Sequence, residues 1–437
     1  MRWKTDDLSG WGGALAREAK LARPERHAAL AEAMAESPCP AIGMRRSYGD
    51  APLAERAIDM TRLDRFIAFD EKTGLLEAEA GVTIADILAS FAPKGWMPAV
   101  MPGTGFATLG GAIANDVHGK NHHLAGSFGQ HVESLVLMGP DGSNQRISLK
   151  TKPRLFRATI GGLGQTGVIL SARLHMAKCP AGRLAVQERR MDDLDAFLEA
   201  FANSGADYQV GWLDMTATDI NLGRGIMEEA HFSQGPFEPP RKARSVPFFA
   251  PGFAMSKPLV KAFNRAYFRR IPEAGRDRER ALHKFFFPLD SILHWNRLYG
   301  KRGFHQFQCV LPDGEARATL TLMLEAVVAS GLASPLSVLK RLGHGRGGMM
   351  SFPMQGYTLA LDIVNRPAAQ KLLAQLNDLA RDAGGRVYLA KDSSLEAGHL
   401  PDMYDELEDF RAELAKADPT GAFTTDLARR LQIRGQK

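Results

Sequence analysis

Glycine and histidine are concentrated in one stretch of the chain, residues 101–129. Glycine recurs there at positions 103, 105, 110, 111, 119, 126 and 129, and the stretch contains His118-Gly-Lys-Asn-His-His123. Because glycine lets a backbone approach a ligand closely, this density indicates contact with a bound molecule. Residues 42–50 form a second glycine-bounded segment, and backbone N–H groups from two such loops can hold a pyrophosphate. We therefore predict that a phosphate-containing ligand binds between these two segments.

Three other kinds of site fit the sequence poorly. The run Gly162-Leu-Gly-Gln-Thr-Gly167 has the spacing of a dinucleotide fingerprint, but a β-type sequence follows it where that mechanism requires a helix. His118, His122 and His123 lack the carboxylate or cysteine partners of common metal sites, so we expect no metal. No Gly-x-Ser-x-Gly segment is present to mark a serine hydrolase.

Length and composition indicate a globular protein of about two domains. The chain has 437 residues, of which 45% are hydrophobic and 24% charged. Its net charge of +6 and pI of about 9.2 suit a protein that meets nucleic acid or an anionic membrane surface. Cys39, Cys179 and Cys309 are far apart, which argues against a disulfide scaffold. Asp6 and Asp7 interrupt any secretory signal, and no run of eighteen apolar residues occurs, so we expect a cytoplasmic protein.

The first part of the chain alternates strand-like and helical patterns. Residues 11–36 carry alanine, leucine and charges at helical spacing, and residues 37–49 read as a strand followed by a tight turn. Further on, strand-like runs surround one helix over residues 84–91, for which Thr83 is a suitable N-cap. This part ends near residue 180, and its pattern is of the α+β class.

From residue 185 the pattern changes and indicates a second domain. We expect a helix over residues 192–203, a long basic and aromatic section over residues 236–302, and then alternating strands and helices. The tail begins with a strand, continues through an acidic amphipathic helix, and ends in a short helix with Arg429 and Arg430.

Several motifs together resemble those of one family. They are Gly43-Met-Arg-Arg-Ser-Tyr-Gly-Asp50, Pro102-Gly-Thr104, Thr108-Leu-Gly-Gly-Ala112, Asp116-Val-His-Gly-Lys-Asn-His-His123 and Val387-Tyr-Leu-Ala-Lys-Asp-Ser393. With them, over nearly its whole length, the chain resembles the FAD-linked oxidases of the vanillyl-alcohol-oxidase fold. The resemblance implies an α+β protein with a two-lobed PCMH-type FAD-binding domain (residues 1–180), a substrate or cap domain (181–385) and a C-terminal segment (386–437) that returns to the FAD domain.

The resemblance also implies which residues contact FAD: Gly43, Arg45, Arg46, Ser47, Tyr48, Gly49, Asp50, Gly103, Thr104, Thr108, Leu109, Gly110, Gly111, Asn115, Asp116, Val117, His118, Val168 and Tyr388. Many oxidases of this fold attach the flavin to a histidine of the first loop. Here that loop contains no histidine or cysteine, so we predict non-covalent FAD. Arg45 stands where the family pattern prefers glycine. It either alters the approach of the backbone to the pyrophosphate or adds a phosphate contact.

Within the family, the resemblance is greatest to enzymes that oxidise the ribose C2 hydroxyl of a polyprenylphosphoryl-β-D-ribose. That oxidation is the first half of an epimerisation to arabinose for cell-envelope polysaccharide. Lys391, Tyr48 and His118 are then the expected catalytic residues, because a cation can orient the hydroxyl and offset charge on the reduced flavin. The alternative for Lys391 is a surface lysine paired with Asp392. The expected substrate-binding residues are Lys120, Gln308, Lys340 and Lys391.

The resemblance implies two further partners. The keto product of such an oxidation must be reduced again, so a separate NAD(P)H-dependent keto-reductase is expected. A polyprenyl substrate lies in a bilayer, and residues 246–270 mix phenylalanines with lysines and arginines. This segment is either a peripheral docking surface for the inner face of the plasma membrane or an amphipathic helix with a solvated basic face.

Three alternatives stay open. An oxidase of another sugar or alditol would share the fold, although such enzymes usually tether their flavin. A polyanion-binding protein would explain the pI, but no nucleic-acid module is recognisable, and we expect no nucleic-acid partner. A third possibility is a polyprenyl-phosphate sugar that serves a different glycan.

Overall fold

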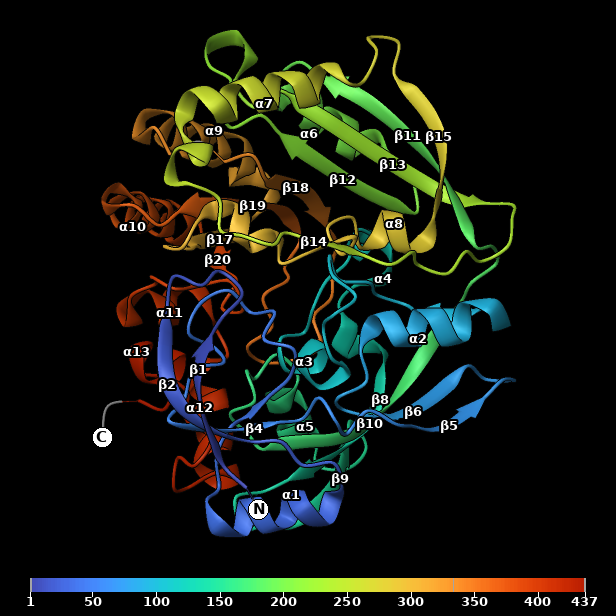
Figure 1. The fold of residues 1–437 in the computed structure, drawn as a ribbon, viewed down its shortest axis with the longest axis vertical. Helices are drawn as coiled ribbons and strands as arrows, with labels where there is room; N and C mark the ends of the chain where they lie inside the picture. The colour runs from blue at the N-terminus through green and yellow to red at the C-terminus, as the bar shows by residue number, and fades with distance from the viewer. Residues whose placement is uncertain (1, 333, 436–437) are drawn as a thin grey trace.

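The structure, a computed structural model, describes residues 2–332 and 334–435. Its strands form an eight-stranded sheet, a six-stranded sheet, a four-stranded sheet and a two-stranded pair. The four- and six-stranded sheets lie in one half of the molecule, together with both ends of the chain, and the eight-stranded sheet lies in the other half (Figure 1). The predicted α+β class is confirmed.

The four-stranded sheet corrects one prediction. Its order is β1-β2-β4-β3, with β1 at Lys4–Ser9, β2 at Ala16–Ala22, β3 at Ala41–Ile42 and β4 at Arg56–Asp59. The helical spacing of residues 11–36 is misleading in its first half, because only α1 (His27–Glu36) is helical there. β2 pairs with β1 on one side and β4 on the other, and this tertiary pairing overrides a weak local preference. The strand and turn predicted over residues 37–49 are confirmed by β3 and the loop after it.

The six-stranded sheet includes β7 (Trp96–Pro98), the strand that precedes the glycine-rich stretch of residues 101–129. Its order is β5-β6-β10-β8-β9, and β7 also pairs with β10. The bounds are β5 Phe66–Asp70, β6 Leu75–Glu79, β7 Trp96–Pro98, β8 Val132–Met138, β9 Asn144–Ser148 and β10 Val168–Lys178, with helices α2 Ile84–Phe91, α3 Leu109–Ala114, α4 His122–Ala125 and α5 Pro153–Thr159. Thr83 caps α2 as predicted, accepting a hydrogen bond from the Asp86 backbone N–H at 3.1 Å. The run Gly162–Gly167 leads into strand β10, as its sequence indicated.

The eight-stranded sheet has the order β15-β11-β13-β12-β18-β19-β17-β20. Its strands are β11 Arg183–Met191, β12 Tyr208–Leu213, β13 Gly225–Ser233, β15 Arg276–Ala281, β17 Phe304–Leu311, β18 Ser337–Leu342, β19 Gly356–Val364 and β20 Arg386–Val387. Helices α6 (Leu194–Asn203, where a helix was predicted), α9 (Asp313–Ser330) and α10 (Pro367–Asp382) pack on one face. The domain boundaries proposed at residues 180 and 385 stay a prediction.

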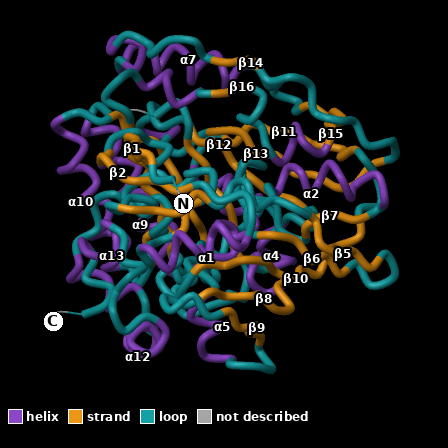
Figure 2. The backbone as a smooth tube through the Cα atoms, turned by 60° about the horizontal axis from the view of Figure 1, so that its bottom comes forward, coloured by secondary structure: helices purple, strands orange, loops and turns teal. Residues whose placement is uncertain are grey.

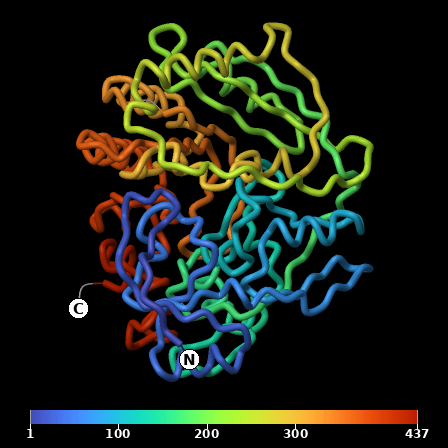
Figure 3. The backbone as a smooth tube through the Cα atoms, viewed as in Figure 1, coloured from blue at the N-terminus to red at the C-terminus, as the bar shows by residue number. Residues whose placement is uncertain are grey.

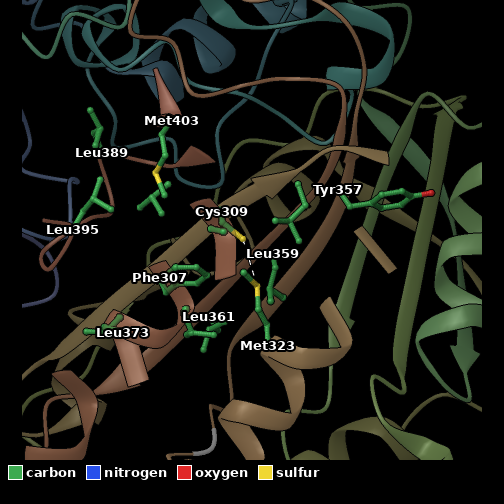
Figure 4. Close-up of a cluster of buried hydrophobic side chains, with 14 of the residues drawn as sticks. Phe307, Cys309, Met323, Tyr357, Leu359, Leu361, Leu373, Leu389, Leu395 and Met403 are labelled. Carbon is green, nitrogen blue, oxygen red and sulfur yellow. Dashed lines mark hydrogen bonds between the residues drawn. The ribbon is translucent and has the colours of Figure 1, made fainter. Parts of the chain in front are cut away.

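Alternation along β17 and β19 gives the large sheet two chemically different faces. Phe307 and Cys309 of β17 pack with Leu359 and Leu361 of β19 against Met323 of α9 in a buried apolar cluster (Figure 4). Side chains of successive strand residues point to opposite faces. The intervening residues, which are Gln306, Gln308, Thr358, Ala360 and Asp362, therefore belong to the opposite face.

The remaining elements are short strands and helices outside the three larger sheets. They are β14 Arg244–Ser245, β16 Ile292–Leu293, α7 Lys257–Arg269, α8 Leu282–Phe286, α11 Leu400–Met403, α12 Leu407–Ala417 and α13 Asp426–Arg430. Six 3₁₀ turns complete the described chain, at Ala92–Lys94, Phe128–His131, Asp219–Asn221, Gly252–Met255, Trp295–Tyr299 and Ala397–His399. Helix α7 lies at the edge of the molecule (Figure 2). The tail has the predicted strand and helices and lies beside the N-terminal strands (Figure 3), where Asp426 pairs with Arg17 at 2.5 Å. In the described part of the chain, no helix is long and apolar enough to cross a bilayer.

Candidate active site

A cavity of about 950 Å³ lies between the two glycine-containing loops and the polar face of the eight-stranded sheet. Ten lysine or arginine residues line it, against four aspartate or glutamate residues. Such an excess of cations favours anionic ligands. Eighteen of the predicted site residues line this cavity: Gly43, Arg45, Arg46, Ser47, Tyr48, Gly103, Thr104, Thr108, Gly110, Gly111, Asn115, Val117, His118, Lys120, Gln308, Lys340, Tyr388 and Lys391.

The two loops meet at a glycine. A Cβ atom on Gly43 would lie 2.3 Å from the Thr108 Oγ1, so a larger residue would force the loops apart. Thr108 caps α3 by accepting a hydrogen bond from the Gly111 N–H at 3.2 Å. A Cβ on Gly103, by contrast, would meet no atom within 4 Å, so this backbone borders open space. The loops therefore form a cradle with room for a ligand directly against the main chain.

Arg45 shows why glycine is preferred at its position. Its φ of 51° lies in the left-handed region, which costs a residue with a side chain about 1 kcal/mol. Its neighbour Arg46 lies 4.0 Å from the centre of the Trp11 ring and 4.7 Å from that of Phe106. Burial lowers the pKa of Arg46, and the Asp290 carboxylate partly offsets this shift. Two successive arginines thus face the cavity from the first loop.

Asp290 connects the second loop, which contains Gly103, to the half of the molecule with the eight-stranded sheet through two hydrogen bonds. It accepts hydrogen bonds from the Thr104 hydroxyl at 2.8 Å and from the Gly105 N–H at 2.7 Å. Burial raises the pKa of this carboxyl group, while these two hydrogen bonds and Arg46 oppose the rise. The contact fixes the loop on which the open backbone of Gly103 lies.

His118 and Gln308 meet across the cavity. Gln308 Nε2 donates to His118 Nε2 at 3.0 Å and to the Thr358 hydroxyl at 3.1 Å. Burial, with Lys340, His122 and Lys391 nearby, holds the pKa of His118 well below its usual value. The imidazole is therefore neutral at pH 7, with its proton on Nδ1. Tyr388 donates from its hydroxyl to the Asn115 carbonyl at 3.0 Å, and burial raises its pKa, so it remains a neutral phenol.

Lys391 projects toward Tyr48, and its ammonium lies 3.8 Å from the centre of that ring. Burial lowers the pKa of Lys391 to about 7, although the carboxylate of Asp362 opposes the shift. Asp392 is engaged elsewhere, with Arg430 at 2.8 Å and two backbone N–H groups. The alternative of a surface pair between Lys391 and Asp392 is therefore disfavoured.

Two further lysines face the cavity. Lys120 donates to the Phe285 carbonyl at 2.6 Å, and burial lowers its pKa to about 8 despite the nearby Glu228. Burial also lowers the pKa of Lys340 to about 8. Within residues 2–332 and 334–435, no side chain or backbone group forms a hydrogen bond or ion pair with the Lys340 ammonium. Lys340 is thus a cation placed to receive an anionic ligand.

Five predicted cofactor contacts lie outside the cavity lining, and each has a structural partner. Asp50 pairs with Arg430, and Asp116 accepts hydrogen bonds from the N–H groups of Gly129 and Gly347 at 2.7 and 2.8 Å. A Cβ on the third, Gly49, would lie 1.9 Å from the Asp392 carbonyl oxygen. The other two, Leu109 and Val168, are buried in apolar clusters.

A group of three hydrogen-bonded residues near Lys391 was not predicted from the sequence. Its members are Asp362, Gln306 and Tyr299. The buried Asp362 accepts hydrogen bonds from Gln306 Nε2 at 2.6 Å and from the Tyr299 hydroxyl at 2.8 Å. Burial raises the pKa of Asp362 to about 7, while these hydrogen bonds and Lys391 oppose the rise. One signal was available, because a single aspartate in the apolar strand of residues 356–364 must have partners.

The remaining histidines of the glycine-rich stretch have structural contacts. His122 Nδ1 accepts from the Gly343 N–H at 3.2 Å, and His123 Nε2 lies 3.0 Å from the Ala206 carbonyl oxygen. Across the described residues, no three histidine, cysteine, aspartate or glutamate side chains are placed to hold a metal ion. The three cysteines are buried free thiols.

Comparison with known proteins identifies the class. Residues 20–148 match the family model of an FAD binding domain. The chain is 33% identical over 413 residues to decaprenylphosphoryl-β-D-ribose oxidase of Mycolicibacterium smegmatis, covering 90% of this chain and 89% of that protein. It is 32% identical to an uncharacterised protein of Streptomyces coelicolor, covering 80% of this chain and all of that protein. A cytokinin dehydrogenase of Oryza sativa is 25% identical over 47% of this chain and 40% of its own length.

These relationships define an FAD-dependent oxidoreductase. The chain belongs to the family that includes decaprenylphosphoryl-β-D-ribose oxidase. The cavity suits FAD, because the open backbone at Gly103 and the loop arginines offer N–H groups and charge to a pyrophosphate. The predicted family and cofactor are thus confirmed.

Proposed function

We propose that this enzyme oxidises the C2 hydroxyl of a polyprenylphosphoryl-β-D-ribose to the 2-keto sugar. The observation that carries the proposal is the cavity, which is lined by a neutral histidine–glutamine pair, Lys391 and two further lysines. Neutral polar groups suit sugar hydroxyls, and cations suit a phosphodiester. The relative named for this activity covers nearly the whole chain, which supports the same substrate class.

Lys391 is the proposed catalytic cation. When bound, FAD would accept the hydride that leaves the sugar C2, and the proton of the C2 hydroxyl would pass to Nε2 of the neutral His118, so that the ketone forms. The Lys391 ammonium, held over Tyr48, orients the C2 hydroxyl and offsets negative charge that develops during hydride transfer. Tyr48 positions this ammonium, and neutral His118 accepts a hydrogen bond from the sugar or from Gln308.

Lys340 and Lys120 are proposed to bind the substrate phosphate, and Gln308 the ribose. Lys340 has no protein partner among the described residues, so a phosphate would supply its counter-charge. Tyr388 and the loops around Gly43 and Gly103 are assigned to FAD. We propose that FAD is held without a covalent bond, because the loop of residues 43–50 has no histidine or cysteine.

Chemical trapping of the product tests the reaction. The holoenzyme is incubated with farnesylphosphoryl-β-D-ribose, and the mixture is reduced with borodeuteride. Oxidation at C2 predicts deuterium at C2 in both ribose and arabinose products. Deuterium at another carbon would move the site of oxidation, and no incorporation together with an oxidised flavin would reject this substrate class.

The exposed surface around α7 supports peripheral membrane docking as part of this function. Phe248, Phe253 and Phe263 are 79%, 68% and 51% exposed, and Lys257 and Lys261 lie on the exposed side of the same helix as Phe263. Apolar side chains flanked by cations favour insertion at an anionic bilayer surface. Phe268, from the same sequence run, instead lies under Arg190 and Arg224, each 5.1 Å from its ring centre. We propose that the enzyme works at the cytoplasmic face of the plasma membrane.

We propose that the enzyme works with a keto-reductase partner. A 2-keto sugar accumulates unless a second enzyme returns a hydride to C2. An NAD(P)H-dependent reductase that delivers it to the opposite face would yield the arabinose epimer. Supplying such a reductase with NAD(P)H should convert the 2-keto product into the arabinose derivative without borodeuteride.

A further inference from the structure

One row of cavity-lining side chains crosses five strands of the large sheet. In this row Gln308 pairs with Ala360, Ala360 with Val338, and Trp212 with Ile226. The antiparallel pairing of Gly211 with Leu339 places Trp212 beside Val338. Neighbouring strands lie about 4.8 Å apart, so the row from β17 to β13 is about 19 Å long.

The row changes from polar to apolar along its length. At one end Gln308 is hydrogen-bonded to His118, where the sugar is proposed to bind. The next side chains, Ala360, Val338, Trp212 and Ile226, present carbon atoms to the cavity. The indole N–H of Trp212 is already satisfied by the Pro335 carbonyl at 3.1 Å. This row therefore offers carbon atoms to an apolar ligand, while Glu228, Arg270 and Arg280 line the cavity beside it.

Aromatic rings continue this apolar wall to the molecular surface. The Tyr267 ring of α7 lies 4.7 Å from the Trp212 ring and 5.8 Å from that of Phe263, which is 51% exposed. Arg270 lies 4.1 Å from the centre of the Tyr267 ring, donates to its hydroxyl at 2.9 Å and pairs with buried Glu188 at 3.4 Å. Tyr267 is thus held between the cavity and the exposed apolar side chains of α7.

We propose that this row is a channel for the isoprenoid tail of the substrate. The tail leaves the sugar at Gln308, passes Val338 and Trp212, and reaches the surface beside α7. The inference rests on the proposed function, because it takes the ligand to be a phosphate-linked isoprenoid. An occupant with a polar head and a long apolar tail matches a row that is polar at Gln308, apolar from Ala360 to Ile226, and joined through Tyr267 to the exposed Phe263.

Equilibrium binding to the holoenzyme tests the channel without turnover. Farnesyl phosphate and methyl phosphate share the phosphate group, so the difference in their affinities measures tail binding. Burial of apolar carbon predicts that the wild-type protein binds farnesyl phosphate at least about tenfold more tightly, as measured by calorimetry. Val338→Trp would fill the channel, and Tyr267→Ala would remove part of its wall. We expect both variants to lose most of the difference.

Phe66→Ala is the matched control, because Phe66 is 40% exposed on β5 and lies outside the cavity lining. It should keep the wild-type preference for farnesyl phosphate. Equal affinities of the wild-type protein for both phosphates would overturn the channel, as would an undiminished preference in both channel variants. If the tail preference appears but no ribose derivative is oxidised, the proposed function fails while the isoprenoid channel stands.

Discussion

Arg430 donates two parallel hydrogen bonds to Asp50, from Nε and from Nη2, both at 2.8 Å. Its Nη2 also donates to Asp392 at 2.8 Å. Asp50 ends the loop of residues 42–50, which is proposed to bind FAD, and Asp392 directly follows Lys391. One arginine of the C-terminal helix α13 therefore connects the loop assigned to the cofactor with the segment that carries the proposed catalytic lysine.

Replacing Arg430 should loosen both segments. Arg430→Met leaves two carboxylates that are at most 7% exposed without their partner, which predicts a loss of about 3 kcal/mol in the free energy of unfolding. Denaturant unfolding and the fraction of FAD retained after gel filtration measure the effect. Arg429→Met is the matched control, because Arg429 forms an exposed i,i+3 pair with Asp426 and its loss should cost less than about 0.5 kcal/mol. Equal stabilities of the two variants would contradict the connecting role.

Lys391→Met tests the catalytic cation. The variant keeps a side chain of similar length without charge, so we expect FAD to remain bound. The rate of anaerobic flavin bleaching by farnesylphosphoryl-β-D-ribose should fall at least about 100-fold, as for loss of a group that stabilises developing charge. Lys301→Met, at an exposed lysine, serves as the control. A rate within threefold of wild type would show that Lys391 has no catalytic part.

The pH dependence of bleaching should follow Lys391. Because burial lowers its pKa to about 7, the ammonium is lost as the pH rises through 7, and the rate should fall on that side. Asp362 faces Lys391 and raises its pKa, so Asp362→Asn should move the alkaline limb to lower pH by about one unit. Stopped-flow rates between pH 5 and 9 measure the midpoint. A midpoint left in place, or a limb moved to higher pH, would contradict this relationship.

Membrane docking should depend on the exposed phenylalanines. Phe248→Ser combined with Phe253→Ser removes apolar surface without touching the cavity lining. Binding to vesicles with 30% phosphatidylglycerol should weaken at least about tenfold, and added salt should weaken it further by screening the cations. The combination of Phe66→Ser and Ile67→Ser, also exposed, should bind as wild type does. Equal vesicle binding by both double variants would place the docking surface elsewhere.

The loops that line the cavity could be predicted because their signals are local. Glycine density and the motif around Ser47 to Asp50 lie within short stretches, and the loops they predict line the cavity. The motif does not reveal which of its members face the ligand. Asp50 and Asp116 match the family motif, but neither lines the cavity. The Asp50 carboxylate accepts a hydrogen bond from Arg430, and the Asp116 carboxylate accepts hydrogen bonds from the backbone N–H groups of Gly129 and Gly347.

The polar face of the large sheet was less accessible to sequence reasoning. Asp362, Gln306 and Tyr299 come together only through the pairing of β17 with β19 and a 3₁₀ turn. Strand pairing between distant segments leaves no local pattern. Strand β2 could not be predicted for the same reason. Its residues have helical spacing, and its strand conformation depends on pairing with β1 and β4.

The absorbance spectrum of the purified protein tests the central claim most directly. It is recorded before and after acid precipitation, and again during anaerobic addition of a polyprenylphosphoryl-β-D-ribose. We predict a flavin band that acid releases into the supernatant and that the substrate bleaches. A flavin that stays oxidised with this substrate would contradict the proposed oxidation, and flavin that remains in the acid precipitate would contradict non-covalent binding.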